Sequence, residues 1–260
     1  MYQEEFKTAV NFAKQKIRFL ISNPFGYVIA SLLAGMFISF GCFVTFTMGA
    51  YLTDAGYAPV KVIMAFSFAS ALSLVMMAGA ELFTGNNFVM AVGTLAGQVS
   101  MKDTWKLWGI NFLGNWLGSV LGTFLFFLTK MPTGIVGNFF AEIAYTKITG
   151  SPGTLFVKGI LCNMLVCLAV WCGIRMKSEA GKLIMIFWCI YIFMICGFEH
   201  SIANMTVILV GLLNPSGLDI TFWDYLYNLF FVTAGNMTGG ILFVAVPYFL
   251  ISKPILKNEK

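Results

Sequence analysis

The chain has 260 residues, of which 59% are hydrophobic and only 10% are charged, and its net charge is +5. A soluble domain of this length cannot hide so much apolar surface in one core, so the composition excludes a soluble protein and predicts an integral membrane protein. The apolar residues form continuous runs without strand-like alternation, which predicts helices rather than a transmembrane β-barrel. The small excess of positive charge does not indicate nucleic-acid binding.

Residues 1–22 are predicted to form an amphipathic cytoplasmic helix that covers residues 3–22. Its apolar residues recur at helical spacing, and its basic residues lie between them. The apolar set is Phe6, Val10, Ala13, Ile17 and Leu20, and the basic set is Lys7, Lys14, Lys16 and Arg18. This pattern fits a helix on the membrane surface or beneath a helix bundle. We interpret it first as an anchor, and a role in gating stays open.

A bundle of six transmembrane spans is predicted for residues 23–252. The spans cover roughly residues 24–52, 61–95, 105–128, 155–174, 184–213 and 225–251. Residues 253–260 are predicted to be a cytoplasmic tail. Six crossings place both termini on one side, and most Lys and Arg residues fall on that side, apart from Lys61, Lys130, Lys147 and Lys158. Positive charge marks the inner side of a membrane, so both termini are predicted to be cytoplasmic.

Spans 2 and 5 are interrupted at corresponding places. Gly79-Ala80-Glu81 in span 2, with Asn86, has the same spacing as Gly197-Phe198-Glu199 in span 5, with Asn204, at an offset of 118 residues. A Gly-Asn-x-x-Gly motif likewise occurs in spans 3 and 6, at 114–118 and 235–239. Matched features in halves of three spans predict one domain built from two inverted repeats, with spans 2 and 5 broken by loops at membrane depth, including residues 84–87.

His200 is the single histidine of the chain, and it lies beside Glu199 inside an apolar run. Ionisable groups within a span are costly, so we interpret His200 as functional, exchanging a proton with an arriving anion. The hydroxyl of Thr84 can both donate and accept a hydrogen bond, which suits a substrate whose protonation changes. Glu81 and Glu199 are interpreted as groups that hold the backbone of the broken spans.

The residues argue against two other classes of membrane protein. A membrane enzyme or metal protein that used His200, Glu199 and Glu81 would need more ligands than one histidine and cysteines without a CxxC motif provide. We therefore predict no enzymatic activity, no cofactor and no metal. A water or glycerol pore would be expected to carry paired Asn-Pro-Ala-type motifs in the breaks, and these are absent there, since Asn214-Pro215 lies in a predicted outer turn.

Three segments together resemble the formate/nitrite transporter family over nearly the whole chain. They are Glu81-Leu-Phe-Thr-Gly85, Lys158-Gly-Ile-Leu-Cys-Asn163 with the run 165–171 that follows it, and Gly197-Phe-Glu-His-Ser-Ile-Ala-Asn-Met205. The resemblance implies an aquaporin-like fold in the inner membrane of a bacterium, assembled as a homopentamer with one pore in each protomer. It further implies that Thr84, Lys147 and His200 form a central polar site, with which Asn163 and Asn204 are associated.

The resemblance also implies apolar constrictions on both sides of that site. The outer constriction corresponds to Phe68 and Phe193, and the inner one to Leu72, Leu82 and Phe83. Within the family the chain is similar to the hydrosulfide channels of clostridia. The segment Gly85-Asn86-Asn87 departs from the formate-channel pattern, which puts formate in doubt as the main substrate.

We therefore predict selective, passive passage of a small monovalent anion or its conjugate acid, with hydrosulfide first. A formate- or nitrite-specific channel, or an aquaporin-like pore for neutral solutes, is the alternative. Lys147 would attract the anion, and His200 would lend it a proton while Thr84 orients it. An anion that moves past a charged imidazolium is the other version of this mechanism.

Overall fold

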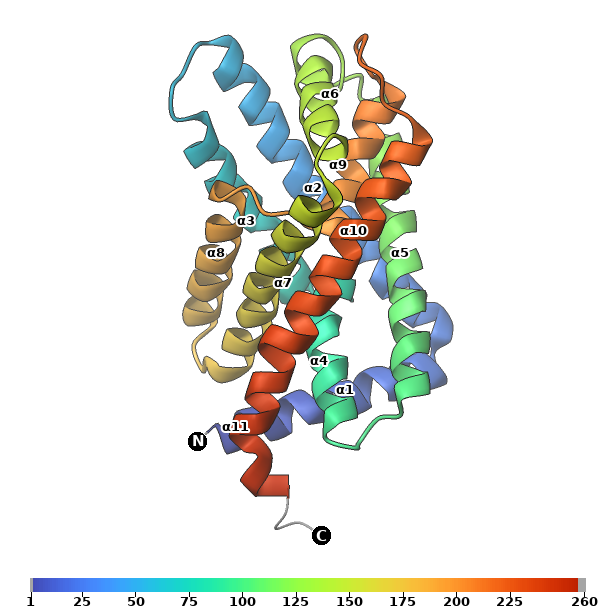
Figure 1. Cartoon of the computed structure of the whole chain (residues 1–260), viewed down its shortest axis with the longest axis vertical. Helices are drawn as coiled ribbons and strands as arrows, with labels where there is room; N and C mark the ends of the chain where they lie inside the picture. Colours follow the sequence, from blue (N-terminus) through green and yellow to red (C-terminus); the bar gives the residue numbers. More distant parts are fainter. Residues whose placement is uncertain (1, 257–260) are drawn as a thin grey trace.

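The computed structural model describes residues 2–256, and every regular element in that part of the chain is helical (Figure 1). The predicted tail therefore lies partly outside the described residues, from 257 onward. The helices are α1 (Gln3–Ser22), α2 (Pro24–Asp54), α3 (Val60–Ala78), α4 (Phe83–Leu95), α5 (Met101–Leu128), α6 (Gly134–Ile148), α7 (Pro152–Arg175), α8 (Glu179–Ile195), α9 (Ser201–Leu213), α10 (Phe222–Gly240) and α11 (Val246–Leu256). A π-helical turn, Ile241–Ala245, joins α10 to α11.

Several helices begin where the sequence supplies a capping residue. Asn23 accepts a hydrogen bond from the backbone N–H of Gly26 at 2.9 Å and is followed by a proline, which suits a first helical position. Ser151 caps α7 in the same way. Thr221 and Asp224 form a reciprocal capping box at the start of α10. These caps place the starts of α2, α7 and α10 close to the predicted span boundaries.

Within the described residues, five helical segments are long and apolar enough to cross a membrane. They are α2, α3, α5, α7 and the continuous segment Phe222–Ser252, which runs from α10 through the π turn into α11. The pairs α3/α4 and α8/α9 are separate pieces, joined by short non-helical segments. We call residues 79–82 the first break and residues 196–200 the second break.

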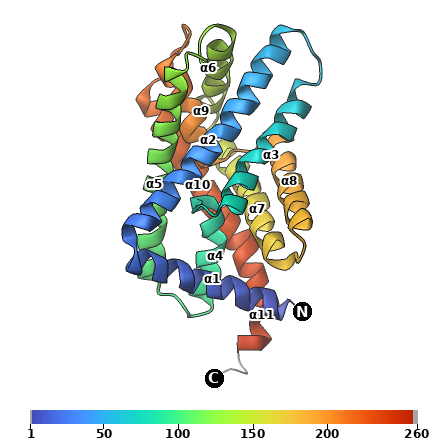
Figure 2. The same cartoon turned by 180° about the vertical axis from the view of Figure 1, so that it is seen from behind.

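The helices form one bundle with distinct ends. α1 runs across the end of the bundle at which both termini lie, and α6 lies at the opposite end (Figures 1 and 2). We call these the α1 end and the α6 end. The sequence analysis predicted no element between the spans at 105–128 and 155–174. The structure shows a helix there, α6, in which Val136, Phe140 and Ala144 are buried at helical spacing, and α6 packs against α9.

The breaks are shorter than the sequence suggested. Residues 84–87 were predicted to belong to a loop, but they form the first turn of α4. Backbone N–H groups in a first helical turn have no intrahelical partner in any case, so poor helix formers cost little there. Each break contains a glycine in the left-handed region at or next to its first residue, Gly79 with φ 77° and Gly197 with φ 69°. A residue with a Cβ would be strained at either position.

Close helix packing predicts a strong effect of one added methyl group. Gly118 of α5 lies against α2, where a Cβ would overlap the carbonyl oxygen of Leu32. We expect Gly118→Ala to destabilise the protein by about 1–3 kcal/mol, because the backbones would have to separate. Gly109→Ala on the same helix is the matched control, since a Cβ there meets no atom within 4 Å. Thermal unfolding of both purified variants tests this, and equal melting temperatures would contradict it.

Candidate functional site

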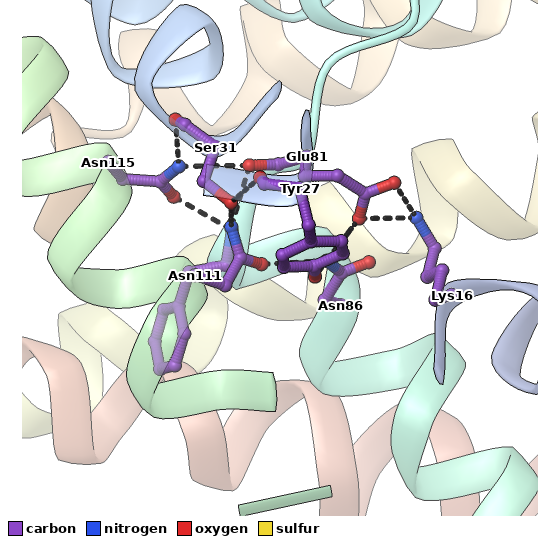
Figure 3. Close-up of polar contacts among 8 residues, drawn as sticks. Lys16, Tyr27, Ser31, Glu81, Asn86, Asn111 and Asn115 are labelled. Atoms are coloured by element: carbon purple, nitrogen blue, oxygen red, sulfur yellow. Dashed lines mark hydrogen bonds and ion pairs between the residues drawn. The ribbon is translucent and has the colours of Figure 1, made fainter. Parts of the chain in front are cut away.

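A partly buried carboxylate organises the first break. Glu81 accepts hydrogen bonds from Lys16 Nζ at 2.6 and 2.7 Å and from Asn86 Nδ2 at 2.8 Å, and Tyr27 donates to it at 3.3 Å. These groups come from α1, α2 and α4, and Figure 3 shows them converging on Glu81. The ion pair therefore ties the amphipathic helix α1 to the first break.

Two asparagines of α5 satisfy the backbone of the first break. Asn111 and Asn115 donate to the carbonyl oxygen of Glu81 at 2.7 and 2.9 Å (Figure 3). Asn115 Oδ1 accepts from the backbone N–H of Phe83 at 2.9 Å. A non-helical segment in an apolar bundle needs such partners, because an unpaired buried peptide group costs free energy. The amide of Asn115, which can donate and accept at once, suits this position.

The second break repeats this arrangement with different residues. Glu199 accepts from Lys147 Nζ and from Asn204 Nδ2, both at 2.7 Å. Asn236 Nδ2 donates to the carbonyl oxygen of Glu199 at 2.9 Å, and its Oδ1 accepts from Ser201 N at 2.9 Å. The contacts of Glu199, Asn204 and Asn236 thus match those of Glu81, Asn86 and Asn115. Each break has its own ion pair and its own asparagine bridge.

The two helices that follow the breaks begin differently. Leu82 is the N-cap of α4 and makes no side-chain capping bond, whereas His200 is the N-cap of α9 and accepts from Ala203 N at 3.1 Å through Nδ1. These two N-cap positions are 118 residues apart, the offset of the matched glutamates. The histidine is therefore the point at which two otherwise matched breaks diverge.

The capping bond fixes the tautomer of His200. A backbone N–H can only donate, so Nδ1 carries no proton in this arrangement and the ring proton is on Nε2. Nε2 lies 2.9 Å from Thr84 Oγ1, in the first turn of α4. Thr84 therefore accepts from His200, and its own hydroxyl proton is left to be donated to a third group. Both side chains are buried.

Aromatic rings lie on one side of the Thr84–His200 pair. The ring of Phe193 stacks on the imidazole of His200 with centroids 6.0 Å apart, and Phe68 meets Phe193 edge-on at 5.8 Å. These are the residues that the family resemblance implied for the outer constriction. The polar pair is thus bordered by an aromatic contact between α3 and α8.

A cavity of about 700 Å³ opens on the other side, toward the α1 end. Leu72 and Leu82 line it, together with Lys16 and Glu81. Phe83, the third residue implied for the inner constriction, is not among the lining residues, and its ring packs edge-on against Phe112 of α5 at 5.1 Å. Charged and apolar groups therefore share this cavity.

The remaining predicted polar site residues lie around the pair without a hydrogen bond to the side chain of Thr84 or His200. Lys147 and Asn204 both contact Glu199, which directly precedes His200. Asn163 donates to Asn87 Oδ1 at 3.0 Å and to the carbonyl oxygen of Asn236 at 2.7 Å. The structure thus brings Thr84 and His200 into direct contact and places Lys147, Asn163 and Asn204 in the surrounding hydrogen-bond network.

Sequence reasoning missed several residues of this network. Lys16 was assigned only to an amphipathic helix, and no role was given to Asn111 or Asn228. Asn111 accepts a hydrogen bond from Asn86, and Asn228 accepts one from Asn204. A signal was available, since asparagines in apolar runs are costly and these recur at similar offsets in both halves. Lys16 carried no comparable signal, so its pairing with Glu81 could not be predicted.

Comparisons with known proteins agree with one another. The sequence profile of the formate/nitrite transporter family matches residues 3–250. The nitrite transporter NirC of Salmonella typhimurium is 36% identical over 247 residues, which cover 93% of this chain and 88% of that protein. An FNT family ion channel has a similar structure, with a TM-score of 0.89, 32% identity and coverage of 95% and 98% of the two chains. A pentameric formate channel with formate bound gives a TM-score of 0.77 at 28% identity, with coverage of 87% and 96%.

Proposed function

Since the chain belongs to the formate/nitrite transporter family, we propose that each copy forms a passive pore for a small monovalent anion or its conjugate acid. The observation that carries this proposal is the buried Thr84–His200 pair, with an aromatic contact on one side and the cavity of the α1 end on the other. A single small polar site between apolar groups suits a small solute that crosses without stable binding. It offers no groups for a large organic substrate.

The proposed pore runs between the two breaks. α3 with α4 and α8 with α9 would each cross the membrane as one broken span, which gives six crossings in two inverted halves. The excess of Lys and Arg at the α1 end supports a cytoplasmic location for both termini. The bacterial nitrite transporter among the relatives supports an inner-membrane protein.

A homopentamer is the proposed assembly. One structural relative is described as a pentameric formate channel. In this chain, α5 exposes a row of large apolar side chains, among them Leu113, Leu117 and Phe124. Such a surface must be covered by lipid or by a neighbouring subunit. Each protomer would keep its own pore, because the Thr84–His200 pair lies inside a single chain.

The lysines of the two ion pairs would offer hydrogen-bond donors to an anion at opposite ends of the pore. Lys16 lines the cavity at the α1 end, and Lys147 reaches Glu199 from α6 at the other end. A bare anion would lose several kcal/mol of hydration on passing the apolar contacts, so a neutral conjugate acid crosses more readily. Thr84 would donate a hydrogen bond to the solute as it passes. Among the described residues, the side-chain oxygens of Asn163 and Asn204 are buried and have no hydrogen-bond donor. They would accept a hydrogen bond from the protonated solute.

The origin of the proton separates two versions of this mechanism. If His200 lent its single ring proton, it would become an imidazolate, which is too basic to persist. If His200 first took up a second proton on Nδ1, the capping bond from Ala203 would be lost. We therefore propose that the anion takes its proton from water at the pore entrance, which leaves a hydroxide ion in the bulk solution, and that His200 keeps its tautomer. If His200 instead lent the proton, as the sequence suggested, the pH dependence of uptake would be lost when His200 is replaced.

Hydrosulfide, nitrite and formate are the candidate substrates. Hydrosulfide follows from the sequence resemblance, whereas nitrite and formate appear in the descriptions of relatives. All three are monovalent anions of weak acids, as the proposed mechanism requires. We keep hydrosulfide as the first candidate because Gly85-Asn86-Asn87 departs from the formate-channel pattern.

Direct flux measurements test the class of solute and its identity together. Proteoliposomes that contain the purified protein are expected to take up hydrosulfide faster than nitrite and formate, and the flux should follow the concentration gradient. Uptake of a divalent anion such as sulfate is the negative control. Osmotic swelling without anion flux would instead support an aquaporin-like pore for neutral solutes. Faster nitrite or formate uptake would reassign the substrate within the family.

A further inference from the structure

A second concave surface lies at the α1 end, away from both breaks. This groove has a volume of about 400 Å³ and is formed where α1 passes the connection between α4 and α5. Its lining combines basic, apolar and small polar side chains. The lining residues are Lys14, Ile17, Arg18, Ile21, Ser22, Gln98, Val99, Ser100 and Asp103. Neither Thr84 nor His200 contributes to it, so the groove is not part of the proposed pore.

The groove carries an excess of positive charge. Lys14 and Arg18 lie one helical turn apart on α1, and both are exposed. Lys14 donates to the neutral side chain of Gln98 at 3.2 Å, so its charge is not neutralised by that contact. The one acidic residue of the lining, Asp103, accepts from Ser100 Oγ at 2.6 Å as part of the cap of α5. Two further lysines, Lys102 and Lys106, are exposed on the first turns of α5.

Exposed apolar side chains line the groove or lie close in sequence to its lining residues. Ile21 is 71% exposed at the end of α1, and Phe25 is 75% exposed at the start of α2. Trp105 is 57% exposed near the start of α5. α2 and α5 are long apolar helices that start at this level, and aromatic residues are common at the interface between membrane and water. The groove therefore combines cations with apolar groups at the depth where lipid headgroups meet acyl chains.

We propose that this groove binds the headgroup of an anionic glycerophospholipid. The phosphate would lie between Lys14 and Arg18, and the acyl chains would pack against Ile21 and Phe25. Cations near a negatively charged membrane surface attract anionic lipids, and each contributes roughly a fivefold gain in affinity. This occupant follows from the adjacency of charge and apolar surface, because a free inorganic anion would use only the cations. The site does not depend on which solute the pore carries.

Native mass spectrometry of the delipidated full-length protein tests the proposal. Phosphatidylglycerol and phosphatidylcholine with identical acyl chains are the probes. We expect selective retention of phosphatidylglycerol, and a loss of roughly thirtyfold in its affinity when Lys14→Gln and Arg18→Gln are combined. The matched control removes two cations at another place with Lys177→Gln and Lys182→Gln, and it should bind as the unchanged protein does.

A variant with the opposite sign guards against misfolding as the cause of any loss. Asp103→Asn removes the negative charge of the lining, so it should bind phosphatidylglycerol about fivefold more tightly. Three results would overturn the proposal. They are equal retention of the two lipids, an equal loss of affinity in the control variant, and displacement of phosphatidylglycerol by excess inorganic phosphate at a concentration that leaves phosphatidylcholine binding unchanged. The last result would identify a phosphate site.

Discussion

Replacing Glu199 by alanine is expected to destabilise the protein by about 3–5 kcal/mol and to abolish anion uptake. Lys147 and Glu199 are an ion pair whose side chains are only 15% and 8% exposed. Without the carboxylate, the ammonium group of Lys147 would be left nearly buried and uncompensated. Asn204, which donates to the same oxygen atom, would lose one of its two acceptors and keep only Asn228. The expected loss in the free energy of unfolding comes from leaving one buried charge unpaired, and it exceeds the net stabilisation that the ion pair provides.

A double variant separates folding from transport. Glu199→Leu combined with Lys147→Met removes both charges, and apolar residues of similar size often replace a buried pair at little cost. We expect its melting temperature to recover toward that of the unchanged protein, while anion uptake stays low because no cation attracts the anion at that end. Thermal unfolding and proteoliposome flux measure the two properties separately. If Glu199→Ala melted at an unchanged temperature, the pair would not stabilise the second break.

The matched pair at the first break provides an internal comparison. Lys16 and Glu81 are more exposed, at 21% and 13%, and Lys16 comes from α1 at the edge of the bundle. α1 can move when the pair is broken, so Lys16 would regain water more easily than Lys147. Glu81→Ala is therefore expected to cost less than Glu199→Ala. Both carboxylates accept from a lysine and an asparagine, and Glu81 has Tyr27 as a further donor, so the expected asymmetry follows from position in the fold.

The positions of the two breaks could be predicted from the sequence, because each is marked by a glutamate, a residue that is costly inside an apolar run. Glu81 and Glu199, at a fixed offset, could be identified without coordinates, and the structure places both at the breaks. The contact between Lys16 and Glu81 could not be predicted in this way. It joins groups 65 residues apart, and one lysine in an amphipathic helix looks like any other. Its pairing depends on how α1 passes beneath the bundle.

Local signals also gave the wrong secondary structure in two places. Glycine and asparagine at 85–87 are poor helix formers, so they were predicted to form a loop. Their position in the first turn of α4, with Asn86 bonded to Glu81 and Asn111, outweighs that preference. α6 was missed because its buried face is short and includes small residues such as Gly137, Ala141 and Ala144, and its burial against α9 is a tertiary effect. In both cases packing overrode propensity.

His200→Asn is expected to keep the fold and to lower anion uptake about tenfold, without shifting the pH dependence of uptake. Asparagine is among the best N-cap residues, so the start of α9 should be preserved. Its shorter side chain would not reach Thr84, and the loss of one polar contact in the passage corresponds to about 1.4 kcal/mol, or a factor of ten. The pH response should persist because, in the proposed mechanism, it comes from ionisation of the solute in water.

Comparing His200→Leu with His200→Asn separates the two contacts of the histidine, since asparagine keeps the capping bond and leucine keeps neither contact. His200→Leu also gives the second break the residue that the first break has at Leu82. Leucine can neither cap α9 nor contact Thr84, so we expect a loss of about 1 kcal/mol in stability and a roughly hundredfold loss of uptake. Flux into proteoliposomes across a range of pH measures both variants, with melting temperatures as the control for folding. If His200→Asn abolished the pH dependence, the proton would be lent by His200, and the capped neutral ring seen here would not be the form that conducts. If His200→Leu transported as well as the unchanged protein, the divergence between the two breaks would have no role in permeation.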